Sequence, residues 1–161
     1  MFSHYLLQEA VPGQFSIFRP FGMLGKFEDE TKIFPALILA QKNKRVLHLS
    51  AGTQLRDYIW VSDLGRFINL LILQDRLTAL PPLVNVGSGS AHSLKDLAKV
   101  IADFIPDFNP IYWNWDQWSG REGEPHSFYS ESDLASKLGM ELTPLSQAFR
   151  ETVIHYMNQH P

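Results

Sequence analysis

The stretch Arg56-Asp57-Tyr58-Ile59-Trp60-Val61-Ser62-Asp63 joins a strand pattern directly to a helix pattern. Its aromatic and β-branched residues favour an extended strand. Ser62 or Asp63 can then cap a helix, because a short oxygen-bearing side chain accepts hydrogen bonds from the free N–H groups of the first turn. The following residues predict a broad apolar helix face, made of Leu64, Phe67, Ile68, Leu71 and Ile72. We expect this helix to be buried on much of its circumference.

The residues before this stretch predict a strand, a turning loop, a helix and another strand. Residues 14–19 form a β-prone run closed by Pro20, and Gly22 and Gly25 then favour a turning loop. Between residues 31 and 43, apolar residues recur at helical spacing, and the segment ends in basic residues that suit the negative end of a helix dipole. Residues 46–49 are the next strand candidate.

The residues after it continue the alternation of strands and helices. Residues 83–86 predict a buried strand that runs into the turn of residues 87–90, and Ser93 with Asp96 forms a capping-box-like helix start. The stripe of that helix comprises Leu94, Leu97, Ala98, Ile101 and Ile105.

The last third of the chain begins with a polar, aromatic segment, residues 106–123, which predicts a long surface loop around one short strand. Ser130 caps a brief helix that Gly139 ends, and Thr143 with Pro144 opens the final helix. One face of the final helix comprises Leu145, Ala148, Phe149, Thr152, Val153 and Tyr156. The whole pattern predicts a single α/β or α+β domain over residues 1–161.

Composition narrows the function classes. A hydrophobic share of 45% with 19% charged residues is typical of one globular domain, and a net charge of -3 argues against nucleic-acid binding. The absence of Cys excludes disulfides, thiolate metal sites and Cys nucleophiles, and the six His residues have no metal-ligand spacing. Residues 1–10 do not resemble a signal peptide, and no apolar run approaches the length of a membrane span. We therefore expect a soluble cytoplasmic protein without a metal.

Four motifs follow one another in a definite order along the chain. They are RPFGMLG at residues 19–25, RDYIWVSD at 56–63, NVGSGS at 85–90 and REGE at 121–124. This order resembles the carboxy-terminal half of extended short-chain dehydrogenases/reductases of the NAD-dependent epimerase/dehydratase kind. The corresponding family motifs are Arg-Pro-Phe-Asn-x-x-Gly, Arg-Asp-Phe/Tyr-Ile-x-Val-x-Asp, Asn-x-Gly-Ser/Thr-Gly and Arg-x-Gly-Asp. The resemblance covers nearly the whole chain and implies part of an extended Rossmann-type fold.

The resemblance also implies a substrate site for a nucleotide-diphosphate sugar. It assigns Arg56 and Arg121 to the substrate phosphates or ribose, and Glu124 to the position of an Asp near the ribose. Arginine suits this role because its planar guanidinium can make bidentate contacts to phosphate. The substrate-binding residues implied are Arg56, Arg121, Glu124 and Asn85. The cofactor neighbours implied are Pro20, Phe21 and Gly22, with NAD or NADP as cofactor of the complete enzyme.

Several family features differ or are missing in this sequence. Gly22 stands where the family has Asn, and Leu24 where it often has Tyr, which removes a polar contact. None of the five Tyr residues is followed by Lys four positions later, so the Tyr-x-x-x-Lys general acid/base pair is missing. The Gly-rich dinucleotide fingerprint is also absent, because Gly87 and Gly89 lack the third Gly. We expect the amino-terminal Rossmann half to be absent, no catalytic residue in this chain, and no cofactor bound by it alone.

Simpler structural roles compete with these assignments. Arg56 could form a surface ion pair with Asp57, and Arg121 could stack on Trp118. Asp63 is expected to cap its helix, and Asn85 to stabilise its turn rather than to touch substrate. Ser88 lies between two glycines, but the longer Gly-x-Ser-x-Gly pattern of hydrolases is absent.

Two hypotheses for the function remain open. The chain is either the nucleotide-sugar-binding portion of an epimerase, dehydratase or reductase, or a non-catalytic remnant that acts as a binding or interaction module. In both cases the surface that would face a Rossmann half should be apolar, which predicts association with a Rossmann-half chain or with a second copy.

Overall fold

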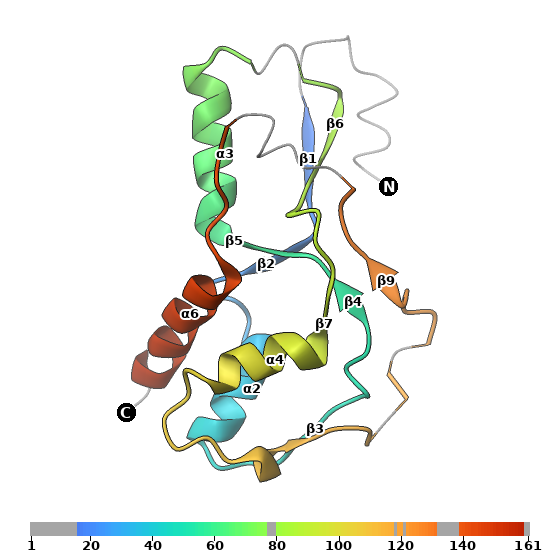
Figure 1. Ribbon diagram of the computed structural model, residues 1–161, viewed down its shortest axis with the longest axis vertical. Helices are drawn as coiled ribbons and strands as arrows, with labels where there is room; N and C mark the ends of the chain where they lie inside the picture. Colours follow the sequence, from blue (N-terminus) through green and yellow to red (C-terminus); the bar gives the residue numbers. More distant parts are fainter. Residues whose placement is uncertain (1–15, 77–79, 118, 121, 132–138, 160–161) are drawn as a thin grey trace.

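The computed structural model describes residues 16–76, 80–117, 119–120, 122–131 and 139–159. The strands are short and alternate with helices, as predicted (Figure 1). The strands are β1 (Ile17–Pro20), β2 (Gly22–Leu24), β3 (Leu47–His48), β4 (Leu55–Arg56), β5 (Tyr58–Trp60), β6 (Leu83–Val86), β7 (His92–Ser93), β8 (Trp113–Asn114) and β9 (Ser127–Phe128). The helices are α2 (Ile33–Lys42), α3 (Val61–Leu73), α4 (Leu94–Ala102), the 3-10 turn η2 (Pro110–Tyr112) and α6 (Leu145–Gln159).

One end of the molecule is a parallel strand pair covered by a helix. Strands β1 and β6 pair from Ile17 with Leu83 to Pro20 with Val86, and α3 lies beside them (Figure 1). Phe18 of β1 meets Phe67 of α3 edge to face, with 5.9 Å between ring centroids. A small hydrophobic cluster, which includes Leu71 and Val84, fills the space between the helix and the strands. It fixes the direction in which β1 and β6 deliver the turns that follow them.

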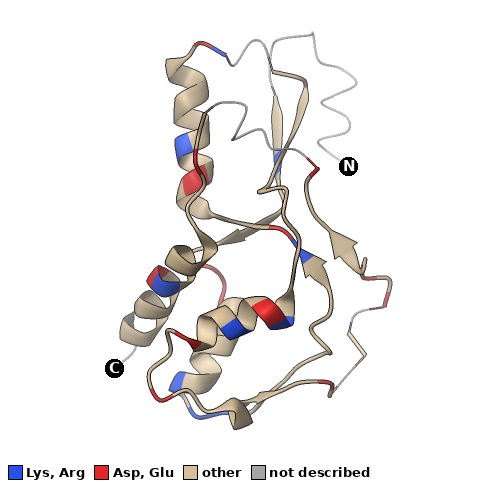
Figure 2. Cartoon of the chain, viewed as in Figure 1, with Lys and Arg blue, Asp and Glu red and all other residues tan. Residues whose placement is uncertain are grey.

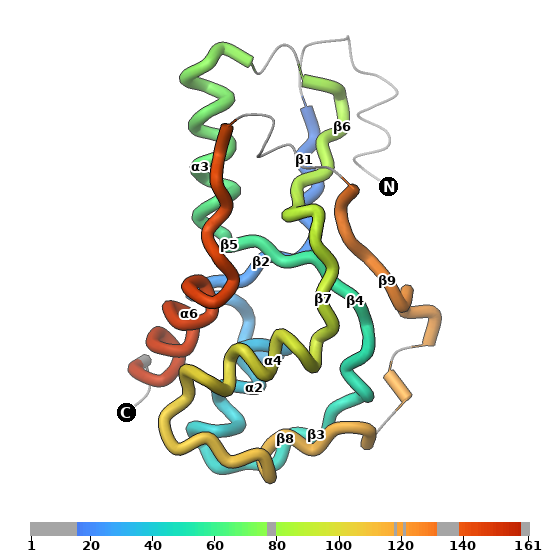
Figure 3. Tube along the Cα trace, in the orientation of Figure 1, coloured from blue at the N-terminus to red at the C-terminus, as the bar shows by residue number. Residues whose placement is uncertain are grey.

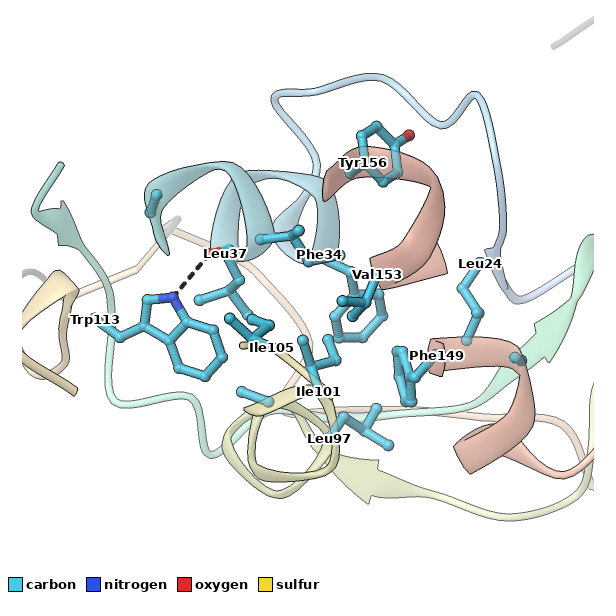
Figure 4. Close-up of a cluster of buried hydrophobic side chains, with 14 of the residues drawn as sticks. Leu24, Phe34, Leu37, Leu97, Ile101, Ile105, Trp113, Phe149, Val153 and Tyr156 are labelled. Carbon is cyan, nitrogen blue, oxygen red and sulfur yellow. Dashed lines mark hydrogen bonds between the residues drawn. The ribbon is translucent and has the colours of Figure 1, made fainter. Parts of the chain in front are cut away.

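The other end is a larger core formed by α2, α4 and α6. Figure 4 shows side chains from all three helices meeting in this cluster. Phe34 of α2 and Phe149 of α6 are fully buried and pack edge to face, with centroids 4.9 Å apart. Trp113 of β8 lies at the edge of the cluster and donates its indole N–H to the Leu37 carbonyl at 2.8 Å. The core therefore also fixes the loop that follows α4.

Strands β2 and β5 run between these two ends (Figure 3). They pair in parallel from Gly22 with Tyr58 to Leu24 with Trp60, and the Gly22 N–H donates to the Asp57 carbonyl at 2.8 Å. The glycines of this segment had predicted a turning loop, so strand β2 was not expected. Nearby, β4 pairs antiparallel with β7 and parallel with β9. The chain thus crosses the middle of the molecule at residues 56–60, within the RDYIWVSD motif.

Two helix starts differ in how well the sequence predicted them. Ser93 caps α4 as expected, because its hydroxyl oxygen accepts from the Asp96 N–H at 3.0 Å. The prediction that Ser62 or Asp63 caps α3 is wrong, since the N-cap is Trp60 and makes no side-chain cap bond. The buried Asp63 carboxylate lies inside the first turn, where it accepts from the Thr143 N–H at 2.9 Å and from the Arg66 guanidinium. Asp63 therefore ties α3 to the segment before α6.

The apolar faces of the helices are mostly as predicted. In α6, Ala148, Phe149, Thr152, Val153 and Tyr156 are all buried. In α3 the expected face ends early, because Ile72 is 56% exposed and the neighbouring Leu73 is 73% exposed. The prediction that α3 is buried on much of its circumference is therefore wrong, since its buried residues are Asp63, Phe67 and Leu71.

Basic and acidic residues are mixed along the helices, as the blue and red segments of Figure 2 show. Within the described residues, every helix is too short or too polar to cross a lipid bilayer. The brief helix predicted between Ser130 and Gly139 lies largely outside the described residues, at positions 132–138.

The core predicts a clear contrast between two neighbouring positions of α6. Phe149→Ala should lower the free energy of unfolding by about 3–5 kcal/mol, because it leaves a cavity among fully buried side chains. Ile154→Ala is the matched control: this side chain is 45% exposed, so the change should cost about 0.5 kcal/mol or less. Urea denaturation of both variants measures the difference, and similar losses would contradict this description of the core.

Candidate functional site

The candidate site is organised by one buried carboxylate, that of Asp57, at the junction of β4 and β5. Its Oδ1 accepts from the N–H and the hydroxyl of Ser88, at 2.9 and 2.6 Å. Its Oδ2 accepts from the N–H groups of Gly89 and Ser130, at 3.2 and 3.1 Å. Because both oxygens are occupied, Asp57 joins β5 to the turn after β6 and to the end of β9. It holds the loops of the site together and leaves no oxygen free for a ligand.

Arg56, the neighbour of Asp57 on the strand, points elsewhere. Its Nη2 lies 2.6 Å from the Glu124 Oε1, and its Nη1 donates to the carbonyl of Leu55 at 2.8 Å and to that of His126 at 3.3 Å. The alternative that Arg56 pairs with Asp57 is wrong. The guanidinium side chain remains 15% exposed beside a single carboxylate, so an anionic ligand could still reach it.

A polar cavity of about 550 Å³, which we call the Glu124 cavity, opens beside this ion pair. It lies among the loops that follow β3 and β8 and the segment before β9. Its walls include Ser50, Gln54, Asp116, Gln117, Glu124 and His126. Hydroxyl, amide and carboxylate groups of this kind can hydrogen-bond a base or a ribose, and the volume is in the usual range for a small-molecule site.

A second cavity of about 470 Å³, the Glu28 cavity, has Tyr58 in its wall. Its walls come from β2, from the loop of residues 25–28, and from Lys32 and Val61. The pKa of Tyr58 is raised to about 12, mainly by burial, with Glu28 and Glu124 adding to the shift and Arg56 opposing it. Tyr58 thus lines the Glu28 cavity and is close enough to Glu28, Arg56 and Glu124 for their charges to act on its hydroxyl.

Glu28 is the carboxyl group with the most altered environment near this site. Burial raises its pKa from 4.5 to about 7, with the Lys32 cation opposing the shift and Asp29 adding to it. Its Oε2 is shielded from water, and none of the described residues donates a hydrogen bond to it. A carboxyl oxygen in this state gains from any donor that reaches the group.

The structure brings some of the predicted site residues together and leaves others apart. Arg56 and Glu124 are in contact, whereas Arg121 lies outside the described residues. Among the predicted cofactor neighbours, Pro20 ends β1, Phe21 packs on Phe128 with centroids 4.7 Å apart, and Gly22 lines the Glu28 cavity.

The remaining predicted site residue, Asn85, lies exposed in β6, opposite Arg19 in the strand pair. Sequence reasoning missed Glu28, Lys32 and Tyr58 as wall residues of a cavity. Tyr58 belongs to the RDYIWVSD motif, but the sequence around Glu28 contains no pattern that predicts a binding site. Among the described residues, no group of three or more His, Asp or Glu side chains could hold a metal ion.

The glycine turn after β6 was the nearest feature to a phosphate-binding loop, and its geometry does not fit one. The N–H groups of Ser88 and Gly89, which such a loop would offer to phosphate, already donate to Asp57. A Cβ built on Gly87 would lie 2.3 Å from the Asp57 Oδ2, so this glycine makes room for the carboxylate. The described residues therefore provide no pyrophosphate site for NAD(P) at this turn.

Comparison with solved structures shows that the fold is that of Rossmann-type epimerases and dehydratases of the extended short-chain dehydrogenase/reductase family. The model of the NAD dependent epimerase/dehydratase family matches residues 4–87, which is more than half of the chain. The chain belongs to this family, as its motif order had predicted.

Individual relatives are similar to the chain at low sequence identity. Over 135 residues the chain is 26% identical to the probable GDP-L-fucose synthase 1 of Oryza sativa subsp. japonica, covering 80% of the chain and 39% of that protein. An NAD-dependent NDP-hexosamine 5,6-dehydratase involved in tunicamycin biosynthesis superposes with a TM-score of 0.78 at 20% identity, covering 98% of this chain and 50% of its own.

A third relative is the UDP-N-acetylglucosamine 4-epimerase of Methanobrevibacter ruminantium M1, in complex with UDP-N-acetylmuramic acid. It has a TM-score of 0.71 at 21% identity, covering 88% of this chain and 46% of its own. The chain thus spans about half the length of these solved structures, and less of the curated relative.

The hydrogen bonds of Asp57 predict that replacing one of its carboxylate oxygens by an amide group destabilises the protein. Asp57→Asn should lower the free energy of unfolding by about 1–3 kcal/mol, because an amide NH2 would face N–H donors that now have an acceptor. Asp116→Asn is the control, since Asp116 is largely exposed and its nearest cation is 3.9 Å away. Equal stability of the two variants in urea denaturation would show that Asp57 is not a structural anchor.

The environment of Glu28 predicts a pH-dependent stability. Because its pKa is raised in the folded state, the folded protein holds this proton more tightly, so stability should fall as pH rises from about 4.5 to about 7. Lys32, Asp29 and Tyr58 are the charged or titratable groups that act on it. Glu28→Gln should remove this part of the pH dependence, and identical pH profiles of the two proteins in denaturant titrations would contradict it.

Proposed function

We propose that this chain is the nucleotide-sugar-binding portion of an NAD(P)-dependent epimerase or dehydratase. The observation that carries the proposal is the Arg56–Glu124 pair, whose carboxylate lies in the wall of a polar cavity of ligand size. A guanidinium group suits a diphosphate, and a carboxylate accepts from sugar hydroxyls. In this proposal the diphosphate lies at Arg56, with Arg121 as a second contact.

In the proposed complete enzyme, NAD(P) would take a hydride from the sugar and return it where the reaction is redox-neutral. The residues of this chain would bind and orient the substrate. The cofactor half and the Tyr-x-x-x-Lys pair would come from sequence outside these 161 residues, and Pro20, Phe21 and Gly22 are proposed only as neighbours of the cofactor. Isomerase, lyase and oxidoreductase chemistry are all compatible with this arrangement.

A second candidate is a non-catalytic module that associates with a separate Rossmann-half chain or with a second copy. Two observations favour an interaction surface: the exposed Ile72 and Leu73 of α3, and the β1–β6 pair, whose only partners among the described strands are each other. Parallel strands are normally covered on both faces. This surface is compatible with both candidates, so ligand binding must distinguish them.

Isothermal titration with UDP-, dTDP- and GDP-sugars, alongside NADH and NADPH, is the test. Binding of a nucleotide sugar without binding of the dinucleotides would support the substrate-binding portion. Binding of none of them, with self-association in analytical ultracentrifugation, would favour the interaction module. Binding of a dinucleotide alone would overturn the first proposal.

The role of Arg56 gives a sharper prediction. Arg56→Gln should weaken binding of the preferred nucleotide sugar by about tenfold or more, because a charge-assisted contact to phosphate is lost. Arg45→Gln, a change in a cation at the far end of α2 that lines neither of the two cavities, should leave the affinity unchanged. Equal affinities of the two variants would remove Arg56 from the binding site.

A further inference from the structure

The polar side chains of the Glu28 cavity come from residues other than Gly22. Gly22, at the start of β2, offers no side chain, and none would fit there. A Cβ at this position would lie 2.5 Å from the Tyr58 ring and 2.6 Å from the Asp57 carbonyl oxygen. The groups that can hydrogen-bond a ligand in this cavity therefore include Glu28, Lys32 and Tyr58 from the opposite walls.

The loop that carries Glu28 is held in place from α6 by three consecutive contacts. The Lys26 ammonium lies 3.3 Å from the Glu151 carboxylate, and the Phe27 ring meets the His155 ring with centroids 4.6 Å apart. The Tyr156 hydroxyl then donates to the backbone carbonyl of Glu28. These contacts fix the backbone on both sides of the Glu28 side chain.

The same loop contains a strained residue. Phe27 has a φ of 67°, in the left-handed region that bulky side chains rarely adopt, and its ring is 81% exposed. A conformation of this kind persists only when the surroundings enforce it, and such positions concentrate at ligand sites. Phe27 and the next residue, Glu28, both line the cavity.

The described part of the protein does not satisfy all the hydrogen-bonding capacity of the Glu28 carboxyl group. Within the part of the chain that the structure describes, no donor reaches its Oε2, which is also shielded from water. The last torsion of a Glu side chain is broad and two-fold, so a small rotation can present a carboxyl oxygen to a group in the cavity. A ligand donor would relieve the cost of leaving this oxygen unpaired.

We propose that Glu28 is a specificity-determining residue, which accepts a hydrogen bond from a hydroxyl group of the sugar. This inference rests on the proposed function and deepens it. The diphosphate lies at Arg56, the nucleoside occupies the Glu124 cavity, and the sugar enters the Glu28 cavity past Tyr58. Lys32 also lines this cavity and can donate to a sugar oxygen, so two residues can hold the ring.

The test compares each nucleotide sugar with its own nucleoside diphosphate. The probes are UDP-glucose with UDP, dTDP-glucose with dTDP, and GDP-mannose with GDP, titrated by calorimetry into the wild-type chain. Glu28→Met removes both carboxyl oxygens at similar length. Glu28→Gln keeps one acceptor oxygen, and Glu30→Met is the matched control, an exposed acidic residue in the same segment that does not line this cavity.

The expected result is that the sugar adds about tenfold or more to the affinity of the wild type and of Glu30→Met. Glu28→Met should lose that gain while its affinity for the nucleoside diphosphate stays the same, and Glu28→Gln should keep part of it. Full retention of the gain in Glu28→Met would overturn the inference and leave the proposed function standing, as would a wild type that binds diphosphate and sugar nucleotide equally. A wild type that binds none of the probes would overturn both.

Discussion

The structure depends on one buried carboxylate, Asp57, which satisfies donors from two distant segments of the chain. Its four hydrogen bonds tie the turn after β6 and the end of β9 to the strand that crosses the middle of the molecule. Such a group is stable inside a protein only because each of its oxygens has donors. The neighbouring Arg56 points to the opposite side of the strand. Asp57, which anchors the loops, and Arg56, the candidate phosphate contact, are therefore consecutive residues. Structure and proposed function are thereby coupled at residues 56 and 57.

Helix α6 has two roles that overlap in space. Its buried face, which includes Phe149 and Val153, completes the core with α2 and α4. Its carboxyl-terminal turns hold the 26–28 loop, which forms a wall of the Glu28 cavity. A ligand site supported by a packed helix is better ordered than one built on loops alone. A change that alters the packing of α6 in the core should therefore also alter the shape of the Glu28 cavity.

The sequence predicted the helices well because their apolar spacing is regular: the faces of α4 and α6 are as expected, and only the burial of α3 and its cap differ. It predicted family and fold from motif order. Strand β2 was hidden because Gly22 and Gly25 favour a turn locally, while its pairing with β5 is a long-range contact. Glu28 was hidden for the same reason, since its environment comes from Tyr58 and α6. Arg56 and Glu124 were identified by resemblance, but their direct ion pair could not be foreseen from spacing.

The contact between Tyr156 and Glu28 spans 128 residues, and strand β1 pairs with a strand that begins 66 residues later. Loops of this length close slowly, because their entropy is lost before the contact forms. During synthesis, the 26–28 loop emerges from the ribosome long before the helix that shapes it. The cavity wall should consequently be among the last parts to mature, and a nascent chain that already has its strands would still lack it.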